Sequence, residues 1–168
     1  ESVAYGAGRF VVVGKGGLVL VSEDGANWAV GNLGHSINLF GVVFGAGKFV
    51  TFDWSGNIFV SLDGETWTMV DSGVSTWLLN GIYAGGQFVI VGYDGTILTS
   101  PDGISWTRRD SGVNVPLEGV TYGGGYYIAV GWYGTILTSR DGINWTRGNS
   151  GIPDIKLLFA ATYADSRY

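Results

Sequence analysis

Short apolar runs follow one another along the whole chain, separated by glycine-rich or polar turns. Residues 10–13 (FVVV) and 97–99 (ILT) are typical of these runs. Runs of this kind, rich in β-branched and aromatic side chains and bounded by turn residues, indicate β-strands. Apolar positions do not recur at a helical spacing, so no long helix is predicted. The pattern predicts an all-β protein built from many short strands.

The pattern repeats with a period of 39 residues. Segments of the form SxDGxxW begin at four positions with this spacing: Ser22, Ser61, Ser100 and Ser139. A second shared block precedes each of them: GRFVVVGKGG, GKFVTFDWSG, GQFVIVGYDG and GYYIAVGWYG. Each unit predicts four short antiparallel strands, which is the content of one β-propeller blade. The blades are expected at about residues 1–40, 41–79, 80–118 and 119–158, with residues 159–168 starting a further strand.

The two ends of the chain lie at the same phase of the repeat, because residues 159–163 (FAATY) match the first strand of a blade. An open half-ring of four blades would leave an unpaired face at each end. A homodimer about a twofold axis would hide both faces in an eight-bladed ring, and this arrangement is favoured. A closed four-bladed monomer and a segment of a longer repeat array are the alternatives.

The SxDG segments predict tight turns between the third and fourth strands of each blade. Ser and Asp side chains accept hydrogen bonds from nearby backbone N–H groups, glycine adopts a positive φ without steric cost, and the Trp ring would be buried between blades. The residues expected to build these turns are Ser22, Asp24, Trp28, Ser61, Asp63, Trp67, Ser100, Asp102, Trp106, Ser139, Asp141 and Trp145. Catalytic or metal-binding roles for the Asp residues are the alternative. Recurrence in every blade favours the structural role.

These segments resemble the Asp-box, or bacterial neuraminidase repeat, although the commoner form has one more residue between the Asp and the aromatic. The wider block also resembles repetitive bacterial propellers and the photosystem II assembly-factor propellers. The resemblance implies a β-propeller and favours an extracellular or cell-surface location. Because the family includes sialidases, it also raises the option of a glycoside hydrolase.

The residues that such chemistry needs are not grouped in the sequence. The resemblance to sialidases implies a site of three arginines, a Tyr nucleophile with a Glu partner, and an acid Asp. Here most arginines fall on predicted outer strands or turns, and Glu118 is the least implausible carboxylate. His35 is the only histidine and has no Ser or Cys nucleophile motif near it. No phosphate loop, dinucleotide fingerprint or zinc spacing occurs, so the sequence predicts no enzyme, no cofactor and no metal.

Composition narrows the classes of partner. The 168 residues are 46% hydrophobic and include 30 glycines and no cysteine, and the net charge is -5. An acidic chain disfavours nucleic acid, which requires a basic surface. No apolar run approaches the roughly 20 residues of a membrane span, so membrane insertion is not expected.

Aromatic residues recur in the turns between second and third strands, where small polar residues are usual. The candidate ligand-binding residues are Trp54, Trp77, Tyr93, Asp94, Trp132 and Tyr133, with Lys15, His35, Asn114 and Asp154 at matching positions of other blades or loops. Aromatic rings beside Asp and Asn side chains are typical of a sugar-binding site, and they are equally typical of a protein interface. The alternative is that these rings only cover the blade edges.

The sequence therefore predicts a non-catalytic binding or scaffolding module that acts through protein interaction or self-assembly. A lectin that uses the loop aromatics is the alternative, and a sialidase-like hydrolase remnant is a second alternative. The expected partners are a second copy of the chain and a glycan or protein ligand.

Overall fold

The structure, a computed structural model, describes residues 1–149, 151 and 157–162. Its strands form four antiparallel sheets of four strands each, and each sheet is one blade. Blades 1 and 2 consist of β1 (Ser2–Gly6), β2 (Arg9–Val13), β3 (Val19–Ser22), β4 (Ala29–Val30), β5 (Leu39–Gly45), β6 (Lys48–Asp53), β7 (Ile58–Ser61) and β8 (Thr68–Val70). Blades 3 and 4 consist of β9 (Leu78–Ala84), β10 (Gln87–Gly92), β11 (Ile97–Ser100), β12 (Thr107–Arg109), β13 (Leu117–Gly123), β14 (Tyr126–Gly131), β15 (Ile136–Ser139) and β16 (Thr146–Arg147).

Each blade is a meander in which every strand pairs with the next one along the chain. In blade 1 a short 3₁₀ turn, η1 (Lys15–Gly17), joins β2 to β3. The first strands of consecutive blades, β1, β5, β9 and β13, lie next to one another. The two- or three-residue fourth strands form the opposite edge of each sheet. The turns between strands two and three therefore lie at the same end of every blade as the loops that connect the blades.

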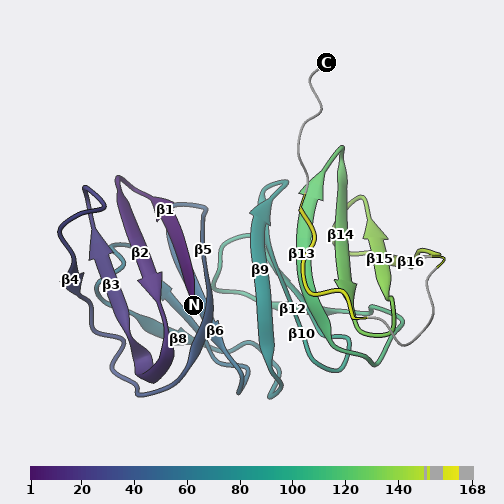
Figure 1. The fold of residues 1–168 in the computed structure, drawn as a ribbon, viewed down its shortest axis with the longest axis horizontal. Coiled ribbons are helices and arrows are strands. Elements are labelled where there is room, and N and C mark those ends of the chain that lie inside the picture. Colours follow the sequence, from purple (N-terminus) through teal and green to yellow (C-terminus); the bar gives the residue numbers. More distant parts are fainter. Residues whose placement is uncertain (150, 152–156, 163–168) are drawn as a thin grey trace.

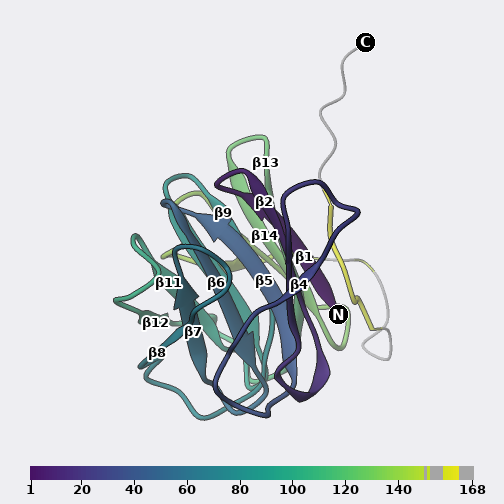
Figure 2. The same ribbon diagram turned by 90° about the vertical axis from the view of Figure 1, so that its left-hand side faces the viewer.

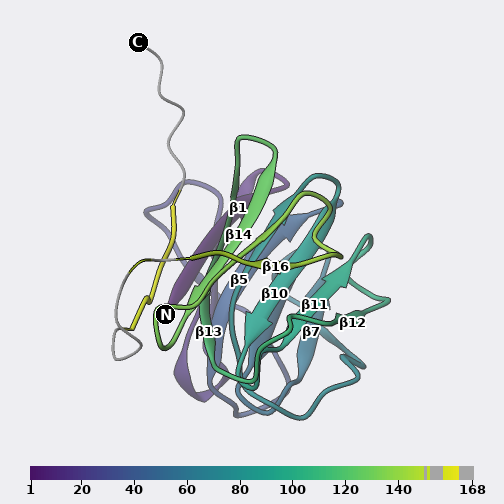
Figure 3. The same ribbon diagram turned by 90° about the vertical axis from the view of Figure 1, so that its right-hand side faces the viewer.

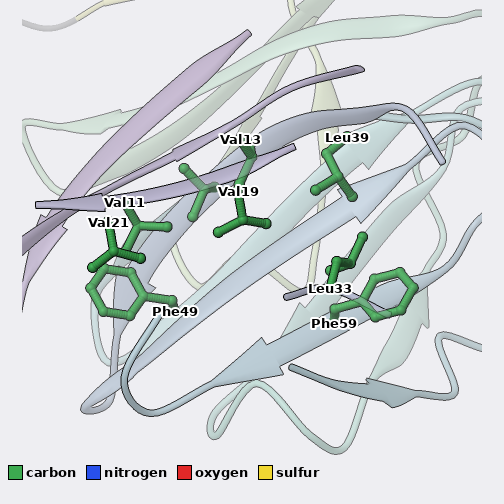
Figure 4. Packing of buried hydrophobic residues seen from close by; sticks show 9 residues of the cluster. Val11, Val13, Val19, Val21, Leu33, Leu39, Phe49 and Phe59 are labelled. Carbon is green, nitrogen blue, oxygen red and sulfur yellow. The ribbon is translucent and has the colours of Figure 1, made fainter. Parts of the chain in front are cut away.

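The core lies between blades rather than within one of them. Side chains alternate across each strand, and both faces of an inner blade are covered, so both sets of side chains are apolar. Val11, Val13 and Val21 of blade 1 belong to one buried cluster with Phe49 and Phe59 of blade 2, and Figure 4 shows Phe49 beside Val11 and Val21. Similar clusters join blade 2 to blade 3 and blade 3 to blade 4. Burying one such Phe contributes about 1.5–3 kcal/mol, so these interfaces hold the chain together.

The four blades form an open row (Figure 1). Among the strands that the structure describes, extensive contacts between blades join only consecutive blades. Blade 1 and blade 4 lie at opposite ends of the row, and Figures 2 and 3 view the molecule from these two ends. The row does not correspond to the closed four-bladed monomer considered from the sequence, because each end blade keeps one face without a neighbouring blade.

The fold class predicted from the sequence is confirmed, since the chain is all-β with four four-stranded antiparallel blades. The boundaries chosen between blades stay a prediction. Of the further strand expected at residues 159–168, residues 163–168 lie outside the described residues. Just before it, Leu157 forms an antiparallel bridge with Trp132 of blade 4. In the part of the chain that the structure describes, no helix is long and apolar enough to cross a membrane.

Candidate functional site

Residues 22–28, 61–67, 100–106 and 139–145, here called the SxDG turns, repeat one set of hydrogen bonds in all four blades. In blade 2, the Ser61 hydroxyl donates to Asp63 Oδ1 at 2.9 Å and accepts from the Gly64 N–H at 2.7 Å. Asp63 Oδ1 also accepts from the backbone N–H groups of Glu65 and Thr66, both at 2.9 Å. The Asp carboxylates of the other three turns accept the same pair of N–H bonds.

These bonds lower the pKa of each Asp carboxyl from its usual value. The largest cause in every turn is the backbone N–H three residues further on, for example that of Thr66 for Asp63. Hydrogen bonds to the ionised form favour that form, so the four carboxylates stay charged. Their lone pairs are directed at their own turn, which supports the structural role predicted for them. That role stays a prediction.

The Trp of each SxDG turn is held in the same way but differs in exposure. The indole N–H donates to the carbonyl of the turn glycine, at 3.1 Å from Trp67 and 3.0 Å from Trp106 and Trp145. These three rings are half-buried, whereas Trp28 of blade 1 is 40% exposed. The ring of Trp28 has no preceding blade to cover it, so the expectation of burial between blades does not hold at this position.

A row of aromatic side chains crosses blades 2, 3 and 4 at the end where the blades are connected. Its members, here called the aromatic ridge, are Phe40, Trp54, Trp77, Tyr93, Trp132 and Tyr133. Successive ring centroids lie 5.5, 5.4, 4.8, 6.1 and 6.2 Å apart, within the range of favourable aromatic pairs. Trp54, Trp77 and Tyr133 are exposed, so the ridge presents apolar surface to solvent. The structure brings all five sequence-predicted aromatics together.

The ridge residues Tyr93, Trp132 and Tyr133 belong to tight turns between the second and third strands of their blades. In blades 3 and 4, the carbonyls of Tyr93 and Trp132 accept hydrogen bonds from backbone N–H groups three residues later, at 2.9 and 3.1 Å. The next residues, Asp94 and Tyr133, have φ of 53° and 56°. Residues other than glycine rarely adopt this left-handed region, and doing so costs roughly 1–2 kcal/mol. Side chains are thus kept at positions where glycine would be more stable.

In blades 2 and 4, a second residue supports the ridge residue of the turn from the first strand of the same blade. Glu118 Oε1 accepts a hydrogen bond from Trp132 Nε1 at 2.6 Å, and Phe40 packs on Trp54. Both supporting residues precede the residue they contact by 14 positions. Phe40 was not predicted from the sequence as part of the ridge, and Glu118 was considered only as a catalytic carboxylate. The constant spacing of 14 residues was the signal that could have found this contact.

Two open clefts lie beside the ridge on blade 3 and share Asp94 and Arg108. The larger, of about 520 Å³, also contains Asp71, Ser75 and Thr76. The smaller, of about 340 Å³, reaches the other candidate loop residue of this region, Asn114. Asp94 is oriented by the Thr76 hydroxyl, which donates to Asp94 Oδ2 at 3.2 Å. Apolar rings and groups of both charges are therefore close together.

The remaining candidates are placed elsewhere. Lys15, which occupies the ridge position in blade 1, forms an exposed ion pair with Glu1 at 3.9 Å. His35 lies against Phe59, with ring centroids 5.4 Å apart. Asp154 lies outside the described residues. Among the residues that are described, no group of three or more His, Cys, Asp or Glu could hold a metal ion.

The architecture and strand order are those of a β-propeller segment, and comparisons with solved structures agree. YCF48 bound to a D1 peptide is similar over 95% of this chain and 55% of its own, with 17% identity and a TM-score of 0.71. The WD40 propeller domain of Doa1 is similar over 88% of this chain and 53% of its own, with 15% identity and a TM-score of 0.65. The GH74 enzyme of Niastella koreensis is similar over 87% of this chain and 24% of its own, with 21% identity and a TM-score of 0.63.

At these identities the likeness establishes the fold alone. This chain spans about half the length of the YCF48 and Doa1 structures, and less of the GH74 enzyme. No family model matches the chain, and no curated protein matches it. Binding proteins and an enzyme share this architecture, so function has to be argued from the site.

Proposed function

We propose that this chain is a non-catalytic binding and scaffolding module whose aromatic ridge binds a segment of another protein. The observation that carries the proposal is the unbroken contact of six rings across three blades. Aromatic side chains supply large contact areas with little loss of conformational freedom, and Trp and Tyr dominate the binding energy of many interfaces.

The clefts beside the ridge suit a polypeptide ligand. Asp71, Asp94 and Arg108 offer charges of both signs next to the exposed ring of Trp77. A bound peptide could place apolar side chains on the rings while its polar groups meet these charges. The similar fold of YCF48, which has been seen with a peptide bound, is consistent with this proposal.

A carbohydrate-binding module is the second candidate. Asp94 and Asn114 lie close to the ridge, and a sugar ring can stack on an aromatic face while carboxylate and amide groups bind its hydroxyls. The hydrolase remnant is less well supported, because the carboxylate of Glu118 already binds the indole of Trp132. A sialidase assay on the purified chain tests that alternative directly.

The test is selection from a displayed library of twelve-residue peptides, with a glycan array probed in parallel. We expect peptides that bind the native chain, and a loss of affinity of at least about tenfold in Trp77→Ala. Met69→Ala is the matched control, because Met69 is an exposed apolar residue on the outer strand of blade 2, away from the ridge.

Both variants are first checked by circular dichroism. Peptide binding that Trp77→Ala and Met69→Ala reduce equally contradicts the ridge as the site. Glycan binding that depends on Trp77, without peptide binding, replaces this proposal with the lectin. A homodimer that completes a ring is a separate proposal, because it depends on the two end blades and not on the ridge.

A further inference from the structure

The outer face of blade 1 carries side chains that are more exposed than those at the matching positions of the other blades. Tyr5 and Val3 of β1 are 60% and 59% exposed. At the position of Val3, the next blade has Val42, which packs in the core between blades 1 and 2 and is only 6% exposed. Trp28, in the SxDG turn of the same blade, is exposed as well. Blade 1 therefore presents the surface with which blades 2, 3 and 4 contact a preceding blade.

Two of the three contacts between consecutive blades include a polar link with the same spacing. From blade 1 to blade 2 and from blade 3 to blade 4, the first residue of strand two reaches the SxDG turn of the next blade, 54 residues further on. Arg9 donates to the carbonyl of Asp63 at 3.0 Å, and Gln87 Nε2 donates to the carbonyl of Asp141 at 2.6 Å. Tyr126 has this position in blade 4 and is 38% exposed. Its hydroxyl can donate to a carbonyl, as the link requires.

The turn glycines mark the same contact from the receiving side. A Cβ on Gly64 would overlap the side chain of Val11 from blade 1, and one on Gly142 would overlap Gln87 from blade 3. A Cβ on Gly25 would meet only Phe10 of its own blade, at 3.7 Å. The SxDG turn of blade 1 therefore leaves open the place that a preceding blade takes at the turns of blades 2 and 4.

The opposite face, on blade 4, is partly covered by residues 157–162. The Leu158 N–H donates to the carbonyl of Gly131 at 3.2 Å, as the Leu39 N–H donates to Gly14 at 3.2 Å between blades 1 and 2. A Cβ on Gly119 would lie 3.0 Å from the Cα of Ala160, so the absence of a side chain at residue 119 permits this close approach. The segment, drawn in yellow beside β13 in Figure 1, occupies the place of the first strand of a following blade.

We propose that a second copy of this chain docks its blade 1 on blade 4, in the register that joins consecutive blades within the chain. The segment 157–162 then holds the place that β1 of the second copy takes, and it must leave before the copy can dock. Two such contacts close a ring, and two copies together have about the length of the YCF48 and Doa1 structures. The proposal does not depend on ridge function.

The register can be tested by cross-linking, because the native chain contains no cysteine. Within the chain, Arg9 of blade 1 contacts Glu65 in the SxDG turn of blade 2, where the carboxylate lies 3.3 Å from the guanidinium. In the proposed dimer, Tyr126 of one copy has the position of Arg9 and Ala26 of the other copy has the position of Glu65, so these two residues should lie close together. We expect the variant Tyr126→Cys with Ala26→Cys to form covalent dimers with a short bismaleimide. The matched control, Tyr126→Cys with Glu65→Cys, places the second thiol in the turn of blade 2 and should give none. Equal cross-linking of both variants overturns the register.

Association is measured by sedimentation equilibrium on the full chain. We expect a monomer–dimer equilibrium that Leu158→Pro tightens by about tenfold, because proline cannot donate the hydrogen bond that holds the segment on blade 4. Tyr5→Asp should weaken the dimer by at least about tenfold, whereas Met69→Asp should not. A monomeric mass for both the native chain and Leu158→Pro overturns the proposal. Trp77→Ala should leave association unchanged, which separates this result from failure of the ridge.

Discussion

The two ends of each blade carry turns of opposite character. The SxDG turns are nearly identical in all four blades and bind their own backbone, as Asp63 binds Glu65 and Thr66. The turns between strands two and three differ from blade to blade, with Lys15, Trp54, Tyr93 and Trp132 at one position. Repetition at one end and variation at the other separates the residues that form the blade from those available to a ligand.

The physical reason lies in what each turn has to satisfy. An SxDG turn needs a carboxylate, a hydroxyl and a glycine at set positions, because three backbone N–H groups must find acceptors over a few residues. A turn between strands two and three closes through backbone hydrogen bonds, such as those from Gly131 to Thr135 and from Thr135 to Trp132. In blade 2 the Asp53 carboxylate also accepts hydrogen bonds from the N–H groups of Ser55 and Asn57. The side chain at the ridge position takes no part in closing the turn, so that residue can differ.

The largest expected effect is a difference between two equivalent tryptophans. Trp106→Ala removes a half-buried ring packed against the core between blades 2 and 3, and should cost about 3 kcal/mol. Trp28→Ala removes the same ring where no blade covers it, and should cost about 1 kcal/mol. Urea unfolding of the two variants measures the difference. Equal losses would mean that the indole–carbonyl bond within the turn, and not the contact between blades, carries the stability.

A smaller effect is expected from acid. The pKa of each SxDG Asp is lowered in the folded chain, so the unfolded chain binds protons first as the pH falls. Stability from these groups is complete above the unfolded value near 3.9 and is lost as the pH falls from there through the lower folded value. Thermal unfolding between pH 6 and pH 2 should show this fall. In Asp63→Asn the fall should be shallower, and an unchanged slope contradicts the argument.

The smallest effect should have the opposite sign. Tyr133 has φ of 56° in a ridge turn, so Tyr133→Gly relieves a disfavoured backbone conformation. Because glycine also makes the unfolded chain more flexible, the net gain in stability should be only about 0.5 kcal/mol. Peptide affinity should fall in the same variant. A variant that is less stable than the native chain would show that the Trp132–Tyr133 contact outweighs the strain.

The period of the sequence was sufficient to predict the blades and most of the ridge. Residues 39 apart have the same place in a repeat, so Trp54, Tyr93 and Trp132 were expected in equivalent turns, and their rings do lie in one row. Phe40 was missed because its contact depends on pairing between β5 and β6 over 14 residues, not on the period.

The period could not predict what differs between equivalent positions. Trp28 and Trp106 belong to the same motif, yet their exposure depends on whether a blade precedes them. Likewise, the docking of Leu158 on Gly131 depends on the free face of blade 4. These properties arise from neighbours in space, which a repeat unit taken alone does not contain.

Because each blade contacts chiefly the blades before and after it, the chain is a linear array of nearest-neighbour units. Duplication of one 39-residue unit within the gene would insert a blade that presents the same two faces to its neighbours. The links from Arg9 to Asp63 and from Gln87 to Asp141 show that these faces accept different residues at one position. Blade number can thus change by whole units during evolution, while the variable turns diverge separately.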